Sequence, residues 1–323
     1  MNKDNTYKIN LDLPPEERWN EVTNDYKNEI INITKYIDDY LLPIGCMSHF
    51  VKWYILRIIN GMINKEKIMY IDELKSIAKI TGVALTRIIL IQMCYEATTS
   101  CTSYMFRLKD TPVHFRTMDW NMLELGKMTI NLEFVKNNNV LFKATSFAGY
   151  VGIMTAMKPE QYSIALNFRL GGDFIWKNIG RFKSEYYPAG YLIREVLCED
   201  LTFINLLDRL ENAKLIAPCY FSGFYKDQAF RIIRSPEKTL YRRISKNMLQ
   251  CNIDHYGDKF NILYSNERIN TIKRLEKNID KLELDPEAIK NYLSIFPVNN
   301  ELTIYTNVIF PTKGTMYTYV TEP

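Results

Sequence analysis

The sequence lacks the features that mark several common protein classes. Its 323 residues include only three histidines and six cysteines, with no CxxC pair and no zinc-binding spacing. No apolar run approaches the length of a membrane span, about 20 residues, and residues 1–8 carry no apolar stretch typical of a secretory signal. Since the net charge is only +4 and basic residues are interspersed with acidic ones, no nucleic-acid partner is expected.

What remains is the composition of an ordinary globular protein, 47% hydrophobic and 24% charged. The cysteines are scattered along the chain, which argues against a disulfide framework and favours reduced thiols. They stand at Cys46, Cys94, Cys101, Cys198, Cys219 and Cys251. Together with the missing signal, this predicts a protein that stays in the cytoplasm or is exported by a non-classical route.

The pattern of the chain changes near residue 100. Before this point, apolar residues recur at helical spacing and predict helices over residues 16–41, 47–63, 71–80 and 84–97. After it, short runs rich in β-branched and aromatic residues predict strands over 102–108, 113–118, 128–136, 140–146, 151–157 and 162–168. We therefore divide the chain into a helical head, residues 1–100, and a body, residues 101–323.

The rest of the body alternates helices and strands. A helical stretch is predicted at about 187–211, strands at 215–222, 229–234 and 239–245, helices at 267–278 and 286–294, and a hairpin at 302–309 and 315–320. This order is typical of an α+β domain in which helices cover two stacked antiparallel sheets.

A cysteine opens the first strand of the body, directly after Ser100. A free thiol has a pKa near 8.5 and is a poor nucleophile at neutral pH unless a base activates it. If Cys101 became the first residue of a chain, its own α-amine could serve as that base. Ser100 is small, so the thiol could attack its carbonyl and cut the chain between Ser100 and Cys101. The alternative is a buried structural cysteine.

Two charged residues follow on the next predicted strand, Arg116 and Asp119. A short hairpin would place this strand directly against the one that begins at Cys101. An arginine beside a thiol favours the thiolate, and an aspartate can hold a new ammonium group. The alternative for each residue is a surface charge or a structural ion pair.

Several motifs resemble those of a known family. They are residues 7–15 (Tyr-Lys-Ile-Asn-Leu-Asp-Leu-Pro-Pro), 101–103, 116–119, 142–152 (Phe-Lys-Ala-Thr-Ser-Phe-Ala-Gly-Tyr-Val-Gly), 302–306 and 312–314. In this order they resemble acid ceramidase and N-acylethanolamine acid amidase, which are N-terminal-nucleophile hydrolases. The resemblance implies an αββα sandwich with an N-terminal helical segment. It also implies an α/β heterodimer from one precursor, with residues 1–100 as the α-subunit.

The resemblance also implies residue roles. Cys101 matches the nucleophile, Arg116 and Asp119 the charged residues beside it, Asn252 an oxyanion-hole donor, and Arg268 a further active-site arginine. Two positions depart from the family pattern. Phe168 stands where the family usually has a glutamate, and Leu275 stands where the partner of an inter-subunit bridge is expected.

The implied reaction is hydrolysis of the amide bond of an N-acyl lipid, ceramide in the first instance, with no metal or organic cofactor. Phe147, Tyr150 and Met154 are candidates for lining the acyl groove, and the aromatic helix at 47–63 for transient contact with a membrane surface. Two alternatives stay open: an amidase for N-acylethanolamines or other N-acyl amides, and a catalytically silent lipid-binding relative, which Phe168 favours.

Overall fold

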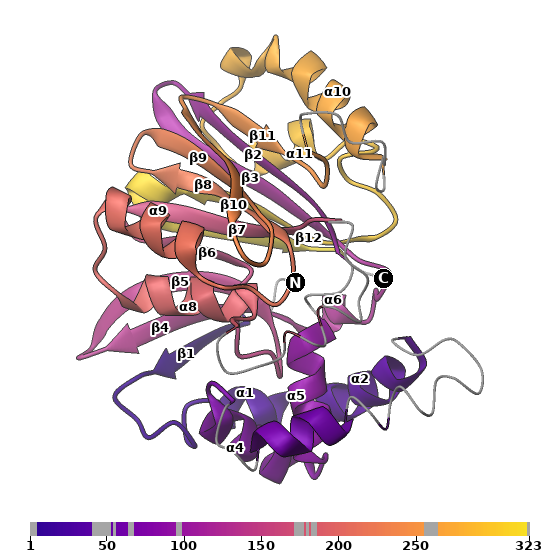
Figure 1. Cartoon of the computed structure of the whole chain (residues 1–323). Coiled ribbons are helices and arrows are strands. Elements are labelled where there is room, and N and C mark those ends of the chain that lie inside the picture. The colour runs from indigo at the N-terminus through magenta and orange to yellow at the C-terminus, as the bar shows by residue number, and fades with distance from the viewer. Residues whose placement is uncertain are drawn as a thin grey trace.

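The computed structural model describes residues 5–40, 53, 56–63, 68–94, 99–170, 178, 181, 186–254 and 264–321. Two sheets form the centre of the body (Figure 1). The eight-stranded sheet has the order β1 (Thr6–Asn10), β4 (Thr129–Lys136), β5 (Asn139–Phe147), β6 (Thr155–Lys158), β7 (Tyr162–Phe168), β8 (Cys219–Tyr225), β9 (Gln228–Arg234), β10 (Thr239–Ser245). The five-stranded sheet has the order β11 (Met248–Gln250), β2 (Ser100–Leu108), β3 (Thr111–Asp119), β12 (Thr303–Phe310), β13 (Thr315–Val320).

Helices cover the outer faces of both sheets. On the eight-stranded sheet these are α8 (Ala189–Cys198) and α9 (Phe203–Asn212), and on the five-stranded sheet α10 (Ser265–Glu276) and α11 (Pro286–Leu293). A separate apolar cluster, which includes Phe106, Phe115, Ile272 and Leu293, fills the layer beneath α10 and α11. The predicted α+β sandwich of two stacked sheets between helices is therefore confirmed.

The head packs against one end of the sandwich (Figure 1). It contains α1 (Asn20–Asp25), α2 (Lys27–Tyr40), α4 (Ile71–Thr81) and α5 (Leu85–Cys94). The predicted helix 16–41 is thus two helices, with a break at Tyr26, whose φ of −108° is not helical. Of the predicted helix 47–63, residues 53 and 56–63 are described and are helical; the rest lies outside the described residues.

The head also supplies a strand that we did not predict. β1 pairs in parallel with β4, Thr6 opposite Asn131, so the larger sheet is not wholly antiparallel. A five-residue strand has no local signature strong enough to separate it from a loop, and its partner lies more than a hundred residues away. β11 and the short helix α6 (Leu125–Met128) were also missed.

Other boundaries moved for local reasons. The helical stretch 187–211 is two helices, because Thr202 caps the second by accepting a hydrogen bond from the amide of Asn205. The strand expected at 151–157 begins only at Thr155, and that expected at 215–222 begins at Cys219. Two short 3₁₀ turns, η2 (Ile279–Lys281) and η3 (Pro311–Lys313), complete the described elements.

The hairpin of β2 and β3 positions the site. Lys109 and Asp110 both have positive φ, 47° and 61°, as a tight two-residue hairpin turn requires. The resulting register places Cys101 opposite Met118 and Ser103 opposite Arg116. The predicted pairing of these two strands is therefore confirmed.

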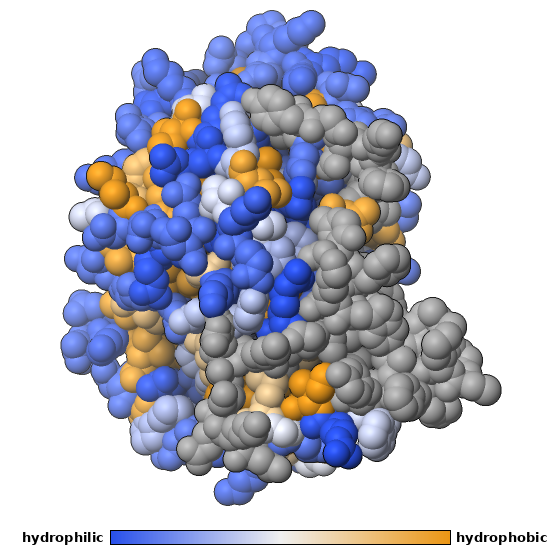
Figure 2. Space-filling model, in the orientation of Figure 1, coloured by the Kyte–Doolittle hydropathy of each residue, from blue (hydrophilic) through white to orange (hydrophobic). Residues whose placement is uncertain are grey.

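Figure 2 shows a face that is predominantly hydrophilic, with its hydrophobic residues in small separate groups. Among the described residues, none of the helices has the length and apolar character needed to span a membrane.

Candidate active site

Cys101 is the second residue of β2 and is fully buried. Its Sγ lies 3.3 Å from Nη2 of Arg116 and 3.7 Å from Sδ of Met118. Its backbone nitrogen donates to Oδ1 of Asn252 at 2.7 Å. The sulfur and the backbone nitrogen of Cys101, the two groups that an N-terminal nucleophile would use, therefore both have partners.

Arg116 directs a buried positive charge at this sulfur. Its guanidinium donates to Oγ1 of Thr155 at 2.6 Å, to Oδ1 of Asn167 at 2.8 Å and to the carbonyl of Leu166 at 2.8 Å. All of these acceptors are neutral, and Arg116 forms no ion pair with any described residue. No carboxylate of the described residues contacts the Arg116 guanidinium, since Asp119, whose pKa Arg116 helps to lower, is paired with Arg268. The arginine N–H at the sulfur can therefore stabilise a thiolate.

Asn252 lies at the Ser100–Cys101 junction. Its Oδ1 accepts from the nitrogen of Cys101, from Oγ of Ser100 at 3.2 Å and from Nη2 of Arg268 at 3.2 Å. Since three donors converge on one atom, that atom must be the amide oxygen. Nδ2 of Asn252 donates to the carbonyl of Phe168 at 2.7 Å. Use of Nδ2 as an oxyanion donor stays a prediction, because in the uncut chain it has this other partner.

Asp119 and Arg268 form a buried ion pair beside the junction, 3.4 Å between Oδ2 and Nη1. Asp119 also accepts a hydrogen bond from Oγ1 of Thr303 at 2.7 Å, and Arg268 donates to Oγ1 of Thr102 at 3.1 Å. Burial raises the pKa of the Asp119 carboxyl, and the Arg268 guanidinium opposes part of that rise. The role expected for Asp119, holding the new ammonium, stays a prediction, since in this structure its carboxylate contacts Arg268 and Thr303.

The structure thus brings together five predicted residues, Cys101, Arg116, Asp119, Asn252 and Arg268, from β2, β3, α10 and the segment after β11. The three candidates for the acyl groove, Phe147, Tyr150 and Met154, are buried in the same apolar cluster as Cys101. This cluster extends from the head through the body, so shared membership does not set them against the sulfur; in this structure they are part of the core, and their role as groove lining stays a prediction.

Three neighbours of Arg116 were missed as site residues: Asn167, Thr155 and Tyr305. Asn167 and Tyr305 fall inside stretches already compared with the family, so their polar side chains in otherwise apolar strands were an available signal. Thr155 carried no such signal, because a threonine in a strand is common. Phe168, the departure from the family pattern, contributes its backbone carbonyl to Asn252 whatever its side chain.

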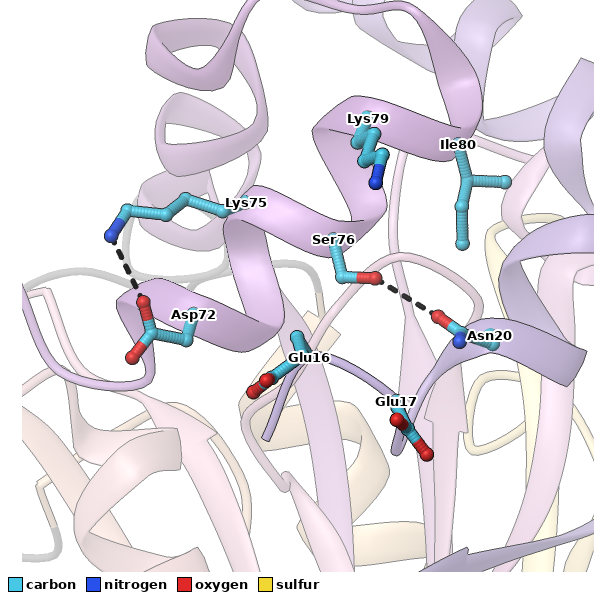
Figure 3. Close-up of a pocket in the computed structure, with 8 residues that line it drawn as sticks. All are labelled: Glu16, Glu17, Asn20, Asp72, Lys75, Ser76, Lys79 and Ile80. Carbon is cyan, nitrogen blue, oxygen red and sulfur yellow. Dashed lines mark hydrogen bonds and ion pairs between the residues drawn. The ribbon is translucent and has the colours of Figure 1, made fainter. Parts of the chain in front are cut away.

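A groove of about 800 Å3 lies elsewhere, on the head between α4 and the segment before α1 (Figure 3). Lys75 points to Asp72 and Ser76 to Asn20, each at 2.9 Å, so much of the polar lining is internally paired. None of its lining residues belongs to the network around Cys101.

A solved structure shares this fold. The N-acylethanolamine-hydrolyzing acid amidase ortholog of Caenorhabditis elegans superposes with a TM-score of 0.56 at 24% identity, covering 69% of this chain and 100% of that chain. In this shared fold, a buried cysteine stands at the start of a central strand and an arginine N–H contacts its sulfur, an arrangement that suits a nucleophilic cysteine.

Proteins with similar sequences identify the family of this chain. The chain is 32% identical to the acid ceramidase of Bos taurus, over 98% of this chain and 86% of that protein. It is 31% identical to an uncharacterized protein of Acanthamoeba polyphaga mimivirus, over 93% of this chain and 94% of that protein. The chain therefore belongs to the acid ceramidase family and is an N-terminal-nucleophile cysteine amidase, and the resemblance found in the sequence is confirmed.

A family model, described as the beta subunit of N-acylethanolamine-hydrolyzing acid amidase, matches residues 2–62. This match falls within the head, residues 1–100, which the resemblance implied to be the α-subunit. The division at residue 100 stays a prediction.

Proposed function

We propose that this amidase hydrolyses the N-acyl amide bond of ceramide to sphingosine and a fatty acid, after it cuts itself between Ser100 and Cys101. The junction carries the proposal: one arginine N–H contacts the sulfur at 3.3 Å and one amide oxygen holds the nitrogen of Cys101 at 2.7 Å. The relationship to acid ceramidases supports the substrate.

Self-cleavage would follow from this geometry. Sγ of Cys101 attacks the carbonyl carbon of Ser100, the C–N bond breaks, and the acyl group moves to sulfur while the nitrogen takes up a proton. Water then hydrolyses the thioester, releasing the Ser100 carboxylate and regenerating the thiol. Oδ1 of Asn252 already accepts from the nitrogen that becomes the α-amine, so the new amine starts in a fixed position.

The same groups would then act on a lipid amide. The α-amine of Cys101 takes the thiol proton, and the thiolate attacks the acyl carbonyl with Arg116 beside the sulfur. The amine product leaves with a proton from the α-ammonium, and water hydrolyses the acyl thioester to a fatty acid. The apolar cluster that contains Cys101, Phe147 and Met154 would suit a hydrocarbon chain.

An amphipathic substrate also requires delivery from a lipid surface. Trp53 is 53% exposed, and the guanidinium of Arg57 lies 5.3 Å from its ring centre. An exposed tryptophan with a cation beside it is typical of residues at a membrane interface, which supports transient membrane contact by this part of the head.

N-acylethanolamines are the second candidate substrate class, favoured by the family model that matches residues 2–62. The two candidates share one chemistry and differ in the amine that leaves. Turnover of a ceramide and an N-acylethanolamine with the same acyl chain would separate them, with Cys101→Ala as the inactive control.

The first test is intact mass after incubation between about pH 4 and pH 8, the range in which an α-amine base and carboxylates change state. We expect fragments that end at Ser100 and begin at Cys101, absent from Cys101→Ala. A chain that stays intact at every pH, with detergent and lipid present, would instead support the silent lipid-binding relative, and Phe168→Glu would then test whether the missing carboxylate is responsible.

A further inference from the structure

We propose that Thr155 and Tyr305 are positioning residues that hold the Arg116 guanidinium against the sulfur of Cys101. The inference deepens the proposed function and rests on it, since it concerns the same nucleophile. Neither residue was a candidate on sequence grounds.

The contacts of Arg116 show why its orientation needs an anchor. A guanidinium is a planar fork of five N–H groups, so fixing Nε and one further nitrogen fixes the direction of all the others. Nε has one acceptor, Oγ1 of Thr155 at 2.6 Å, the shortest hydrogen bond that Arg116 makes. The two terminal nitrogens share four acceptors: Asn167, Ser103, the carbonyl of Leu166, and Sγ of Cys101.

The hydroxyl of Thr155 is itself oriented by Tyr305. Because a guanidinium has only donors, Oγ1 of Thr155 must accept from Arg116. Its remaining partner is the hydroxyl of Tyr305 at 3.0 Å. Tyr305 is fully buried, and its ring packs near that of Phe147, with 5.9 Å between centroids. Burial raises the pKa of Tyr305, so the phenol stays neutral and keeps its hydroxyl proton.

The chain of contacts crosses the sandwich. Thr155 lies on β6 of the larger sheet, whereas Arg116 and Tyr305 lie on the paired strands β3 and β12 of the smaller one. A contact between rigid elements of both layers locates a side chain more closely than a loop contact can. The stacking of the two sheets thus orients the Arg116 guanidinium toward the sulfur of Cys101.

A matched control residue lies next to Thr155. Thr145, on β5, is its direct cross-strand partner and is equally buried. Its hydroxyl, however, interacts with Asn307 at 2.9 Å and Thr318 at 2.8 Å rather than with Arg116. Replacing either threonine by valine removes one buried hydroxyl from the same layer, but only one replacement affects the arginine.

The experiment measures two rates in the full-length protein: self-cleavage by intact mass, and alkylation of Cys101 by iodoacetamide, read by peptide mass. We expect Thr155→Val to slow both by about tenfold or more, because a misdirected N–H no longer meets the sulfur. For Thr155→Ser, which keeps the hydroxyl, both rates should stay within about threefold of wild type. For Tyr305→Phe, both rates should be about threefold lower than in wild type. For the control Thr145→Val, neither rate should change by more than about twofold.

The outcomes separate the two proposals. If wild type does not cleave but Thr155→Val still alkylates about tenfold more slowly, the proposed self-cleavage fails and the positioning role stands. If Thr155→Val matches wild type in alkylation, if Thr155→Ser is no better than Thr155→Val, or if Thr145→Val is slowed equally, the positioning role is overturned.

Discussion

Two buried arginines of this protein have opposite surroundings. Arg194, on α8, meets the carboxylate of Glu73 from α4 with two contacts, 2.6 and 2.7 Å, and its guanidinium lies 4.0 Å from the ring centre of Tyr70. Arg116, equally buried, has neutral acceptors and a thiol. One guanidinium is in direct contact with a carboxylate, while the other has none in contact among the described residues.

The difference separates a structural role from a chemical one. Glu73 also accepts from Nε1 of Trp19 at 2.7 Å and from Arg18 at 3.2 Å, so this ion pair is the centre of a contact between head and body. A buried charge without a counter-ion lowers stability. Its presence at Arg116, at hydrogen-bond distance from a cysteine, is therefore better explained by reactivity than by folding.

The largest expected effect is on stability, at Arg194. Arg194→Met would leave the Glu73 carboxylate buried with only its remaining donors, and such losses cost about 3–5 kcal/mol. Urea unfolding would measure this. The matched control is the double variant Glu73→Gln with Arg194→Met, which removes both charges and should recover much of the loss; equal stability of the single and double variants would contradict a paired structural role.

Arg116 should behave in the opposite way. Arg116→Met is expected to slow self-cleavage by about 10²- to 10³-fold, the effect of removing one preorganised electrostatic contact. Its stability should fall less than that of Arg194→Met, because the partners it leaves behind are neutral acceptors rather than a carboxylate. Arg116→Lys should not restore the rate, since an ammonium cannot reproduce the planar fork. A loss of stability like that of Arg194→Met would remove the contrast between the two arginines.

A buried histidine, His114, extends the comparison of Arg116 and Arg194, because its burial favours the neutral form of the ring. His114, two residues before Arg116 on β3, is fully buried with Nδ1 2.9 Å from Oγ of Ser163. Burial, with a smaller contribution from Arg116, lowers its pKa from 6.5 to about 3. Between these values the unfolded chain binds a proton that the folded protein does not, so stability must fall as the pH falls.

The expected size is about 2 kcal/mol between pH 7 and pH 5. Urea unfolding at both pH values would show it, and His114→Gln, which has no ring to protonate, should lose that part of the pH dependence. If the free energy of unfolding changes equally with pH in wild type and in His114→Gln, the fold does not lower the pKa of His114.

Much of the body could be predicted because its signals are local. The short turn expected between the strands at 102–108 and 113–118 was enough to place Arg116 and Asp119 against the strand of Cys101. The family pattern added Asn252 and Arg268, which no local rule singles out. Both lie at the junction, although Asn252 presents its oxygen rather than its N–H to Cys101.

The sequence by itself determined the hairpin, the cysteine at its start and the α+β class, because turn chemistry and hydrophobic period act between residues close in the chain. Only the tertiary structure decided that β1 joins the larger sheet, that Glu73 neutralises Arg194 across 121 positions, and that Thr155 meets Arg116 between the sheets. These contacts depend on how layers stack, and the physical reason they are invisible in the sequence is that stacking brings together side chains from distant segments.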